Sequence, residues 1–490
     1  MENIASGEDQ DYVKIGLECH VQLTKLKTKL FCGCSADYRG LEPNTSVCPV
    51  CLGLPGTLPV PNRRAFELGL MIANALNCEI PETCSFYRKN YTYVDLPKNY
   101  QISMYEAPDG SRTLARGGYL TLKADGQRKK IRIWRIQLEE DPGRNVFKGS
   151  ITTSPETLVD YNRSGIALCE IVTAPDISSP KEARLFAQKL RSIVEHLGVT
   201  DGSLEGSMRF DANISVGGGK VVEIKNITSF KAVQRALGFE VTRQKSLRKR
   251  GVVVGRETRH YDELRKITVS LRSKETVEDY RYFRDPDLMP IRITSEMVES
   301  VRRMMPELPD SRAERFVSQY GLPEYDAGVL TASKRLADFF EECVRLYNEP
   351  KKVSNWLMTE LLGFLNKRGL EIDELKITPR HIVDMLRLID DKTISGKIAK
   401  TVMREMLETG REPRDIVEAA KLTRITDIAV LKEIVDEVFA EFPSVVQQAF
   451  SDPKIRNHLV GQVMKKSGGR ADPILTNRLI AEKMERMKNP

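Results

Sequence analysis

The sequence predicts an α+β protein in which a large sheet-rich domain is followed by helical domains. Up to residue 295, short runs of β-branched and aromatic residues alternate with Gly, Pro and Asn, as strands alternate with turns. After Pro290, apolar residues recur three and four positions apart, which indicates amphipathic helices. The segment 409–413, Thr-Gly-Arg-Glu-Pro, interrupts this periodicity. We therefore expect a sheet-rich domain, a helical domain and a helical tail at residues 1–295, 296–412 and 413–490.

The individual elements have local signals of their own. The clearest strand signals are the runs at residues 13–17, 119–122, 131–136, 168–172 and 267–271. One helix in the sheet-rich part is well defined, because Ser179 can cap it, Pro180 suits its first turn and Gly198 can end it. Beyond Pro290, helical spacing is plainest at residues 336–346, 354–365 and 382–388.

The composition indicates a globular protein of the cytoplasm. The chain has 490 residues, of which 41% are hydrophobic and 29% charged, so it can form several cores. No apolar run approaches the ~18 residues that cross a bilayer, and residues 1–11 lack the layout of a secretory signal. We therefore expect no membrane contact. Nine cysteines, an odd number, favour reduced thiols over a disulfide framework.

Positive charge is concentrated in two segments. Residues 231–274 contain thirteen Lys and Arg against four Asp and Glu, a local net charge of +9. Residues 451–490 contain nine against four, a local net charge of +5, whereas the whole chain has +8. Such clusters favour a polyanionic partner, and the alternative is a set of solvated helix faces.

Four cysteines have the spacing of a zinc site. Cys32 and Cys34 form one close pair, and after thirteen residues Cys48 and Cys51 form a second. Two such pairs wrap a tetrahedral zinc ion from two short loops, here within residues 31–52. Four thiolates leave zinc no open position, so a structural role is expected. The other cysteines are interpreted as packing residues.

Acidic residues in three strand-like segments suggest a second metal site. Glu18 and His20 lie on one face of the first strand, because side chains alternate along a strand. Glu170 is enclosed in an apolar run and needs a cation or proton donor if it is buried. With Glu139 or Glu140, these residues would form an oxygen-rich cage suited to Mg²⁺, although the imidazole is more typical of Mn²⁺ or Zn²⁺.

A nucleotide would need an unusual pocket. The chain has no G-x-x-x-x-G-K-S/T phosphate loop and no G-x-G-x-x-G that opens a helix. Polar and positive groups that could serve instead lie at Arg88-Lys-Asn-Tyr, Lys98-Asn-Tyr-Gln, Ser207-Met-Arg-Phe-Asp-Ala-Asn and Lys225-Asn. Ordinary loops would have the same composition.

Longer motifs along the chain resemble the B subunit of tRNA-dependent amidotransferases, the GatB family. The motifs are Ile15-Gly-Leu-Glu-Cys-His-Val-Gln, Arg88-Lys-Asn-Tyr-Thr-Tyr, Pro97-Lys-Asn-Tyr-Gln-Ile-Ser, Leu138-Glu-Glu-Asp-Pro-Gly, Asn162-Arg-Ser-Gly, Glu170-Ile-Val, Gly206-Ser-Met-Arg-Phe-Asp-Ala-Asn-Ile-Ser, Glu223-Ile-Lys-Asn and Asp279-Tyr-Arg-Tyr-Phe. The segment from Gly461 to Pro473 is similar to the tail module that the family shares with YqeY-type proteins. Cys19 departs from the pattern, since an aliphatic residue is common there, and only some members carry the zinc cysteines.

The resemblance implies a cradle-shaped catalytic domain, a helical domain and a tail that grips tRNA. It implies that mischarged Glu-tRNA(Gln) or Asp-tRNA(Asn) is converted to the amide. Because oxide is a poor leaving group, Mg-ATP first phosphorylates the side-chain carboxylate and ammonia then displaces phosphate. Which of the two tRNAs is the substrate stays open.

The resemblance also implies roles for individual residues. The expected Mg²⁺ ligands and catalytic residues are Glu18, His20, Glu140 and Glu170, with Glu139 as a possible substitute. The expected ammonia route includes Lys89, Lys98 and Asp211, for which a structural salt-bridge network is the alternative. The expected nucleotide or substrate contacts are Arg88, Asn90, Tyr91, Asn162, Arg163, Ser207, Arg209, Asn213 and Lys225.

The chain contains no glutaminase signature, so ammonia must come from another chain. The resemblance implies an amidase-type A subunit as the source and a small C subunit, in a heterotrimer. The expected cofactors are ATP, Mg²⁺ or Mn²⁺, and structural Zn²⁺. The competing interpretation is a noncatalytic, zinc-containing tRNA-binding adaptor, for which the basic segments would suffice. Converging carboxylates at Glu18, Glu140 and Glu170 argue against it, because they would repel RNA.

Overall fold

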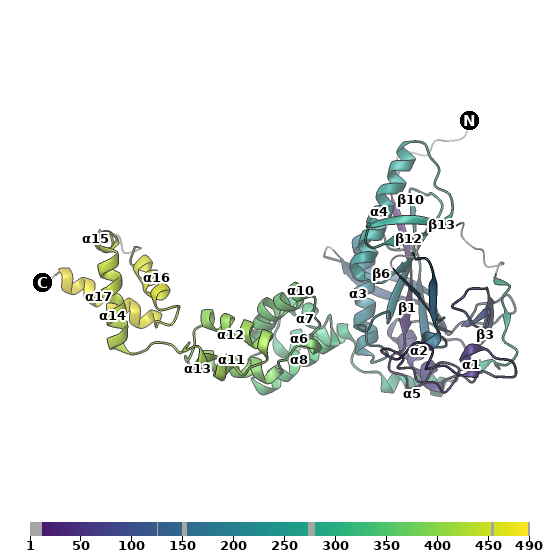
Figure 1. The fold of residues 1–490 in the computed structure, drawn as a ribbon, viewed down its shortest axis with the longest axis horizontal. Helices are drawn as coiled ribbons and strands as arrows, with labels where there is room; N and C mark the ends of the chain where they lie inside the picture. The colour runs from purple at the N-terminus through teal and green to yellow at the C-terminus, as the bar shows by residue number, and fades with distance from the viewer. Residues whose placement is uncertain (1–11, 125, 149–153, 273–279, 452–454, 489–490) are drawn as a thin grey trace. The chain divides into compact units, whose positions relative to one another are not determined.

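A computed structural model of the chain describes residues 12–124, 126–148, 154–272, 280–451 and 455–488. The chain divides into two compact units, Met1–Ser311 and Arg312–Pro490. The first contains the sheet and the second is helical (Figure 1). The predicted α+β class is confirmed. No helix among the described residues is long and apolar enough to cross a membrane.

The first unit is built on one large mixed sheet. In the described part of the chain it has eleven strands in the order β13-β12-β11-β10-β1-β9-β6-β4-β3-β14, and β5 pairs with β6. Their bounds are β1 Val13–Gln22, β3 Phe86–Asn90, β4 Tyr100–Met104, β5 Ala115–Ala124, β6 Gln127–Glu140, β9 Ala167–Thr173, β10 Met208–Val216, β11 Val222–Ile227, β12 Glu257–Asp262, β13 Ile267–Arg272 and β14 Phe283–Arg284. Two small sheets pair β2 (Thr83–Cys84) with β15 (Ile291–Arg292) and β7 (Arg144–Phe147) with β8 (Thr157–Asp160).

Helices cover one face of this sheet. They are α2 (Arg63–Ala75), α3 (Pro180–His196) and α4 (Phe230–Lys249), and they pack on β1, β5, β6, β10, β11 and β13 (Figure 1). Leu17, Cys19 and Val21 of β1 point to this side and are fully buried. Because neighbours on a strand alternate, Glu18 and His20 point to the opposite, polar face. We call these two sides the covered face and the polar face.

The predicted helix after Ser179 is confirmed as α3. The Ser179 side chain accepts a hydrogen bond from the Glu182 amide, and Gly198 follows with a φ of +68°. Phe186 and Leu190 are fully buried in the core that also contains the apolar side of β1. The cap and the apolar stripe therefore act together to place this helix on the sheet.

The first unit extends beyond the predicted boundary at residue 295. Helix α5 (Ser295–Met304) packs against α2, and Val301 is buried in the core of the sheet. Helical spacing alone does not reveal which core a helix joins, so the sequence assigned α5 to the helical domain.

The second unit contains two apolar cores. The helices are α6 Pro309–Tyr320, α7 Glu324–Leu330, α8 Lys334–Leu346, α9 Pro350–Trp356, α10 Leu362–Arg368, α11 Pro379–Asp390, α12 Gly396–Thr409, α13 Pro413–Ala419, α14 Ile428–Glu441, α15 Pro443–Ser451, α16 Arg456–Lys466 and α17 Pro473–Lys488. One core runs from Phe316 to Val417, and the other from Leu431 to Met484. The predicted break at 409–413 ends α12, but α13 still packs in the first of these cores.

Candidate functional site

Three neighbouring strands bring acidic residues together on the polar face. His20 of β1 is directly opposite Glu170 of β9, and their Nε2 and Oε2 atoms are 3.8 Å apart. Glu139 projects from β6, the next strand, on the same side. One ligand atom from each of His20, Glu139 and Glu170 lies within 4.8 Å of the others. The strand register therefore builds a candidate metal centre from residues that are far apart in the sequence.

Glu18 lies beside this group rather than in it. It is two residues before His20 and opposite Asp211 of β10. Its Oε1 accepts a hydrogen bond of 2.8 Å from Asn213. Glu18 therefore adds negative charge to the polar face, and its side chain is held by an amide.

Glu140, predicted as a metal ligand, lies on the covered face. It follows Glu139 directly on β6, so its side chain points the other way. There it forms an ion pair with Lys98, and its Oε1 accepts a 2.9 Å hydrogen bond from the Ile102 amide. Glu139 occupies the position first predicted for Glu140. The error arose because two adjacent acids cannot be assigned to faces before the pairing of β6 is known.

Burial and repulsion from neighbouring carboxylates raise the pKa of both carboxylates of the metal group, although cations lie nearby. Burial and the neighbouring Glu170 raise the pKa of Glu139, against the opposing influence of Lys89 and His20. Burial and then Glu18 raise the pKa of Glu170, against the opposing influence of Arg135, whose Nη2 lies 3.9 Å from Glu170 Oε1, and of Lys89. Two carboxylates and an imidazole in such a place fit a divalent cation. The cation would offset the repulsion between the carboxylates and the cost of burying their charge. This donor set suits Mn²⁺ or Zn²⁺ as well as Mg²⁺.

Uncharged side chains orient the two carboxylates. Ser103 donates a 3.0 Å hydrogen bond to Glu139 Oε2, and Gln137 donates one of 3.1 Å to Glu170 Oε2. Gln137 also donates to the Ser103 hydroxyl at 3.3 Å. Neither Ser103 nor Gln137 is among the site residues predicted from the sequence, although Gln137 precedes Glu139 by two residues and therefore shares its face.

Lys89 approaches the polar face from β3. Burial lowers the pKa of its ammonium, but Glu139 and Glu170 outweigh that effect, so the pKa is raised. Its Nζ lies 4.8 Å from the ring centre of Tyr280 and 5.6 Å from that of Tyr91. Lys89 is thus a cation held over aromatic rings near the metal group.

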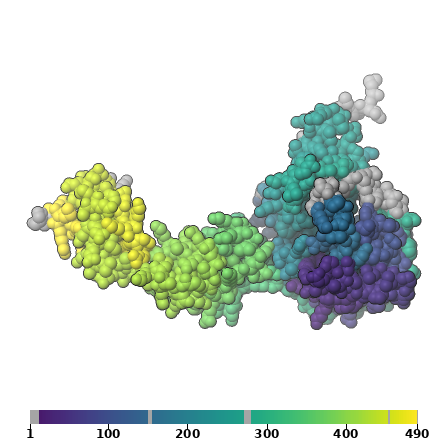
Figure 2. All heavy atoms as spheres, in the orientation of Figure 1, coloured from purple at the N-terminus to yellow at the C-terminus, as the bar shows by residue number. Residues whose placement is uncertain are grey.

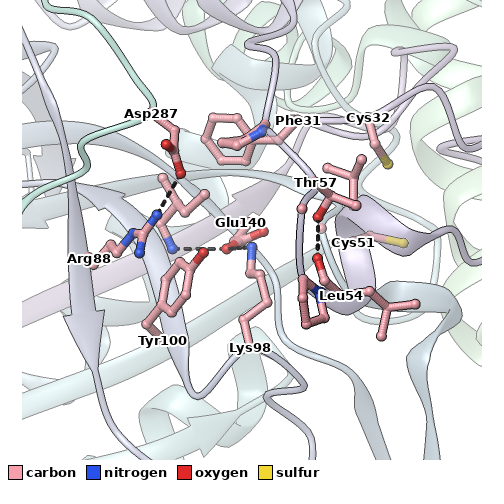
Figure 3. Close-up of a pocket in the computed structure, with 17 residues that line it drawn as sticks. Phe31, Cys32, Cys51, Leu54, Thr57, Arg88, Lys98, Tyr100, Glu140 and Asp287 are labelled. Carbon is pink, nitrogen blue, oxygen red and sulfur yellow. Dashed lines mark hydrogen bonds and ion pairs between the residues drawn. The ribbon is translucent and has the colours of Figure 1, made fainter.

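A pocket of about 170 Å³ opens on the covered face beside Lys98 and Glu140 (Figure 3). Arg88 lies at one side, where it pairs with Asp285 at 2.9 Å and Asp287 at 2.8 Å. The other side is formed by the cysteine loops, including Cys32, Cys51 and the segment 53–57. Lys89 and Lys98, both predicted for an ammonia route, therefore lie on different faces of the sheet, and Asp211 lies with Lys89.

The predicted substrate contacts have varied surroundings. Asn162 accepts from the Ser46 amide at 2.7 Å and donates to the Glu42 carbonyl, so it holds a loop. Arg163 donates to two backbone carbonyls, Arg209 pairs with buried Asp141 at 2.7 Å, and Lys225 approaches Glu223 at 3.7 Å. Asn90 donates to the carbonyls of Tyr280 and Arg281, whereas the buried Ser207 hydroxyl has no hydrogen-bond partner among the described residues. Their roles toward a substrate stay predictions.

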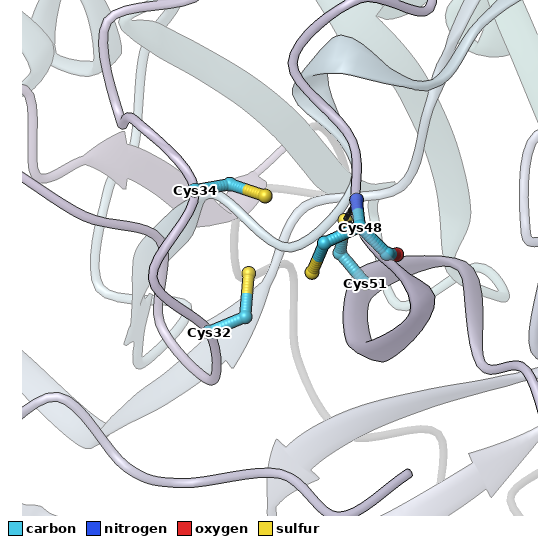
Figure 4. A group of neighbouring side chains, drawn as sticks. All are labelled: Cys32, Cys34, Cys48 and Cys51. Carbon is cyan, nitrogen blue, oxygen red and sulfur yellow. Dashed lines mark hydrogen bonds between the residues drawn. The ribbon is translucent and has the colours of Figure 1, made fainter.

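The four predicted zinc ligands converge. The sulfurs of Cys32, Cys34, Cys48 and Cys51 lie within 4.8 Å of one another (Figure 4). A zinc ion with Zn–S bonds of ~2.3 Å needs sulfurs about 3.8 Å apart, so the set fits tetrahedral zinc with small adjustments. Cys48 precedes the short helix α1 (Pro49–Leu52), and its amide donates to Cys51 Sγ at 3.1 Å. The remaining cysteines lie in or against the apolar cores, as predicted.

The comparisons with known proteins agree with this arrangement. A family model described as the GatB/GatE catalytic domain matches residues 13–299, and one described as the GatB domain matches residues 338–484. Proteins named as the B subunit of aspartyl/glutamyl-tRNA(Asn/Gln) amidotransferase are similar over 96% of this chain. The protein from Sulfurisphaera tokodaii is 52% identical, that from Thermotoga maritima 51% and that from Carboxydothermus hydrogenoformans 50%, and 98% of each is covered. With the acidic strands, the cysteine loops and the helical tail all inside these matches, the chain belongs to the GatB family.

Proposed function

We propose that this chain is the subunit of a tRNA-dependent amidotransferase that activates and amidates a mischarged aminoacyl-tRNA. The substrate would be Glu-tRNA(Gln), Asp-tRNA(Asn) or both. Membership of the GatB family and the names of the relatives support this activity. The observation in the structure that carries it is the group formed by the half-buried His20 and the buried Glu139 and Glu170.

The reaction has two balanced steps. In the first, a side-chain carboxylate oxygen of the aminoacyl group attacks the γ-phosphorus of ATP, and the bond to ADP breaks. In the second, ammonia attacks the carbonyl carbon, the bond to the phosphate oxygen breaks, and phosphate leaves as nitrogen loses a proton. A Mg²⁺ ion held by His20, Glu139 and Glu170 would neutralise charge on the transferred phosphoryl group.

The chain's own residues would position these groups. Ser103 and Gln137 fix the carboxylate oxygens of Glu139 and Glu170, so no reorganisation is needed when charge develops. The Lys89 ammonium is close enough to attract a phosphate or carboxylate oxygen to the same face. The polar face would thus hold the metal, the phosphoryl group and the acceptor carboxylate together.

Ammonia would reach this site from the pocket next to Lys98 and Glu140. The relatives are named as one subunit of an amidotransferase, which supports a complex of several subunits. An amidase-type A subunit would supply ammonia, and a small C subunit would complete a heterotrimer. The buried Lys98–Glu140 pair lines the pocket, and Glu140 belongs to β6, the strand that carries Glu139 on its other face, so the pair is suited to control passage.

The adaptor interpretation finds no support in the comparisons, which match the catalytic domain over residues 13–299. It also does not explain the buried carboxylates, because in a protein that only binds RNA they would repel the RNA phosphates. An adaptor would need only the basic segments.

Replacing Glu170 tests the proposed function. We expect Glu170→Ala, assembled with its partner subunits, to lose ATP-dependent amide formation while its affinity for tRNA stays within a few-fold of wild type. The assay uses mischarged tRNA, ATP and either glutamine or ammonium. Wild-type activity of the variant with free ammonium would refute the assignment of this site.

Removing the tail tests its role in tRNA binding. Because α13 packs in the first helical core, the truncated protein should keep that helix and have Leu422 as its last residue. We expect KM for tRNA to rise about tenfold or more and kcat to change less, since residues 451–490 of the tail carry a local net charge of +5. An unchanged KM would exclude the tail from tRNA recognition.

A further inference from the structure

Lys29 is a lysine without any exposed surface. It lies in the loop between β1 and the cysteine loops, and its relative exposure is 0%. Lysine is among the residues least often buried, because its ammonium is strongly hydrated and its removal from water is costly. A lysine kept in such a place needs a partner that stabilises its charge.

The partners of Lys29 come from the cysteine loops. Its Nζ donates a 2.8 Å hydrogen bond to the Ser46 carbonyl and a 3.7 Å hydrogen bond to Cys51 Sγ. Among the described residues, Lys29 forms no ion pair with a carboxylate. Of the two groups that its ammonium contacts, the one that can carry a negative charge is therefore a sulfur that would hold zinc.

The chain makes room for this contact at Gly165. A β-carbon there would lie 3.3 Å from Cys51 Cβ and 3.5 Å from Lys29 Cδ, and the φ of Gly165 is +86°. A side chain at this position would crowd Cys51, would touch Lys29 at an ordinary contact distance and would strain the backbone. The loop after Asn162 thus closes over the lysine stem and holds it against Cys51.

We propose that Lys29 is the internal counter-ion of the four-thiolate zinc centre. Zinc with four thiolates carries a net charge of −2, and burial of that charge is costly without a cation nearby. The Lys29 ammonium offsets half of it and donates an N–H···S hydrogen bond to Cys51. The Ser46 carbonyl directs the ammonium, as groups around a metal site commonly orient its ligands. This inference goes beyond the proposed function and holds whether or not the chain amidates tRNA.

The test compares Lys29→Met with Lys27→Met in the purified full-length chain. Lys27 is exposed and two residues away, so its replacement is a matched control. We expect wild type and Lys27→Met to bind one zinc per chain. Lys29→Met should bind zinc with an affinity lower by roughly 10- to 100-fold, measured by competition with a chelator. This is the usual effect of losing a partner of a metal ligand.

A merely structural role for Lys29 predicts a different result. In that case Lys29→Met would lower Tm equally with zinc and with chelator present, and zinc affinity would not change. The proposal instead requires the zinc-dependent rise in Tm to shrink in Lys29→Met. Unchanged zinc affinity, or wild-type protein without zinc, would overturn it.

Two further variants decide the matter if Lys29→Met does not fold. Lys29→Arg keeps a cation and should retain zinc affinity within a few-fold, whereas Lys29→Gln keeps a donor without charge and should lose affinity like Lys29→Met. Equal zinc affinities of these two variants would show that charge is irrelevant and would overturn the proposal.

Discussion

Glu139 and Glu140 are adjacent on one strand yet occupy opposite environments. On the polar face, Glu139 has an uncharged partner, Ser103, and two other acidic or imidazole groups close by. On the covered face, Glu140 has its own cation, Lys98. Glu140 is compensated by its own lysine, whereas Glu139 and Glu170 repel each other and keep raised pKa values despite Lys89 and Arg135, so an added cation would still stabilise them. The proposed metal site and the proposed control point for ammonia would therefore occupy two sides of the same strand.

The largest expected effect is the difference in amidation rate between variants of Glu139 and Glu140. Glu139→Gln should lower amidation at least about 1,000-fold, about 4 kcal/mol, with either glutamine or ammonium, because a ligand for the metal is lost. Glu140→Gln should retain ammonium-dependent amidation better than glutamine-dependent amidation. Rates with the two nitrogen sources measure this difference. Equal losses of glutamine-dependent and ammonium-dependent amidation in both variants would contradict the different roles of Glu139 and Glu140.

The next effect concerns stability. Glu140→Gln leaves the Lys98 ammonium buried without its partner, since the Glu140 side chain is 3% exposed and that of Lys98 is 6% exposed. We expect the first unit to lose roughly 3 kcal/mol or more of unfolding free energy. Chemical denaturation of the variant measures it, and the double variant Glu140→Gln, Lys98→Met is the control that should recover part of the loss. A single variant as stable as wild type would show that the pair is dispensable.

The smallest expected effect is a gain in stability, and it depends on pH. The folded state raises the pKa of Glu139, so folding favours its protonated form. The stability that the protonated Glu139 contributes is fully present below the unfolded pKa, near 4.5, and is lost as the pH rises through the folded pKa. Without divalent metal, Glu139→Gln should therefore be more stable than wild type at pH 7.5, by on the order of 1 kcal/mol, and equally stable at pH 4. Thermal melts at the two pH values measure this, and a gain that persists at pH 4 would point to another cause.

Local patterns predicted much of the molecule. The cap at Ser179, the spacing of Cys32, Cys34, Cys48 and Cys51, and the shared face of Glu18 and His20 each depend on neighbours in sequence. The choice between Glu139 and Glu140 depends on how β6 pairs with β9. The buried position of Lys29 depends on loops that are far apart in the sequence. Such features require long-range contacts, which no short segment specifies.

The register between β1 and β9 sets a limit on how this protein can change. A shift of one residue would turn His20 toward the helices and bring Leu17 and Cys19 out among the acids, because every side chain on the strand would exchange sides. Single substitutions in these strands alter one contact at a time, whereas inserting or deleting one residue within a strand would turn that strand's side chains to the other face. Changes in length should therefore be confined to the turns, and related chains that keep the activity should keep the lengths of β1, β6 and β9.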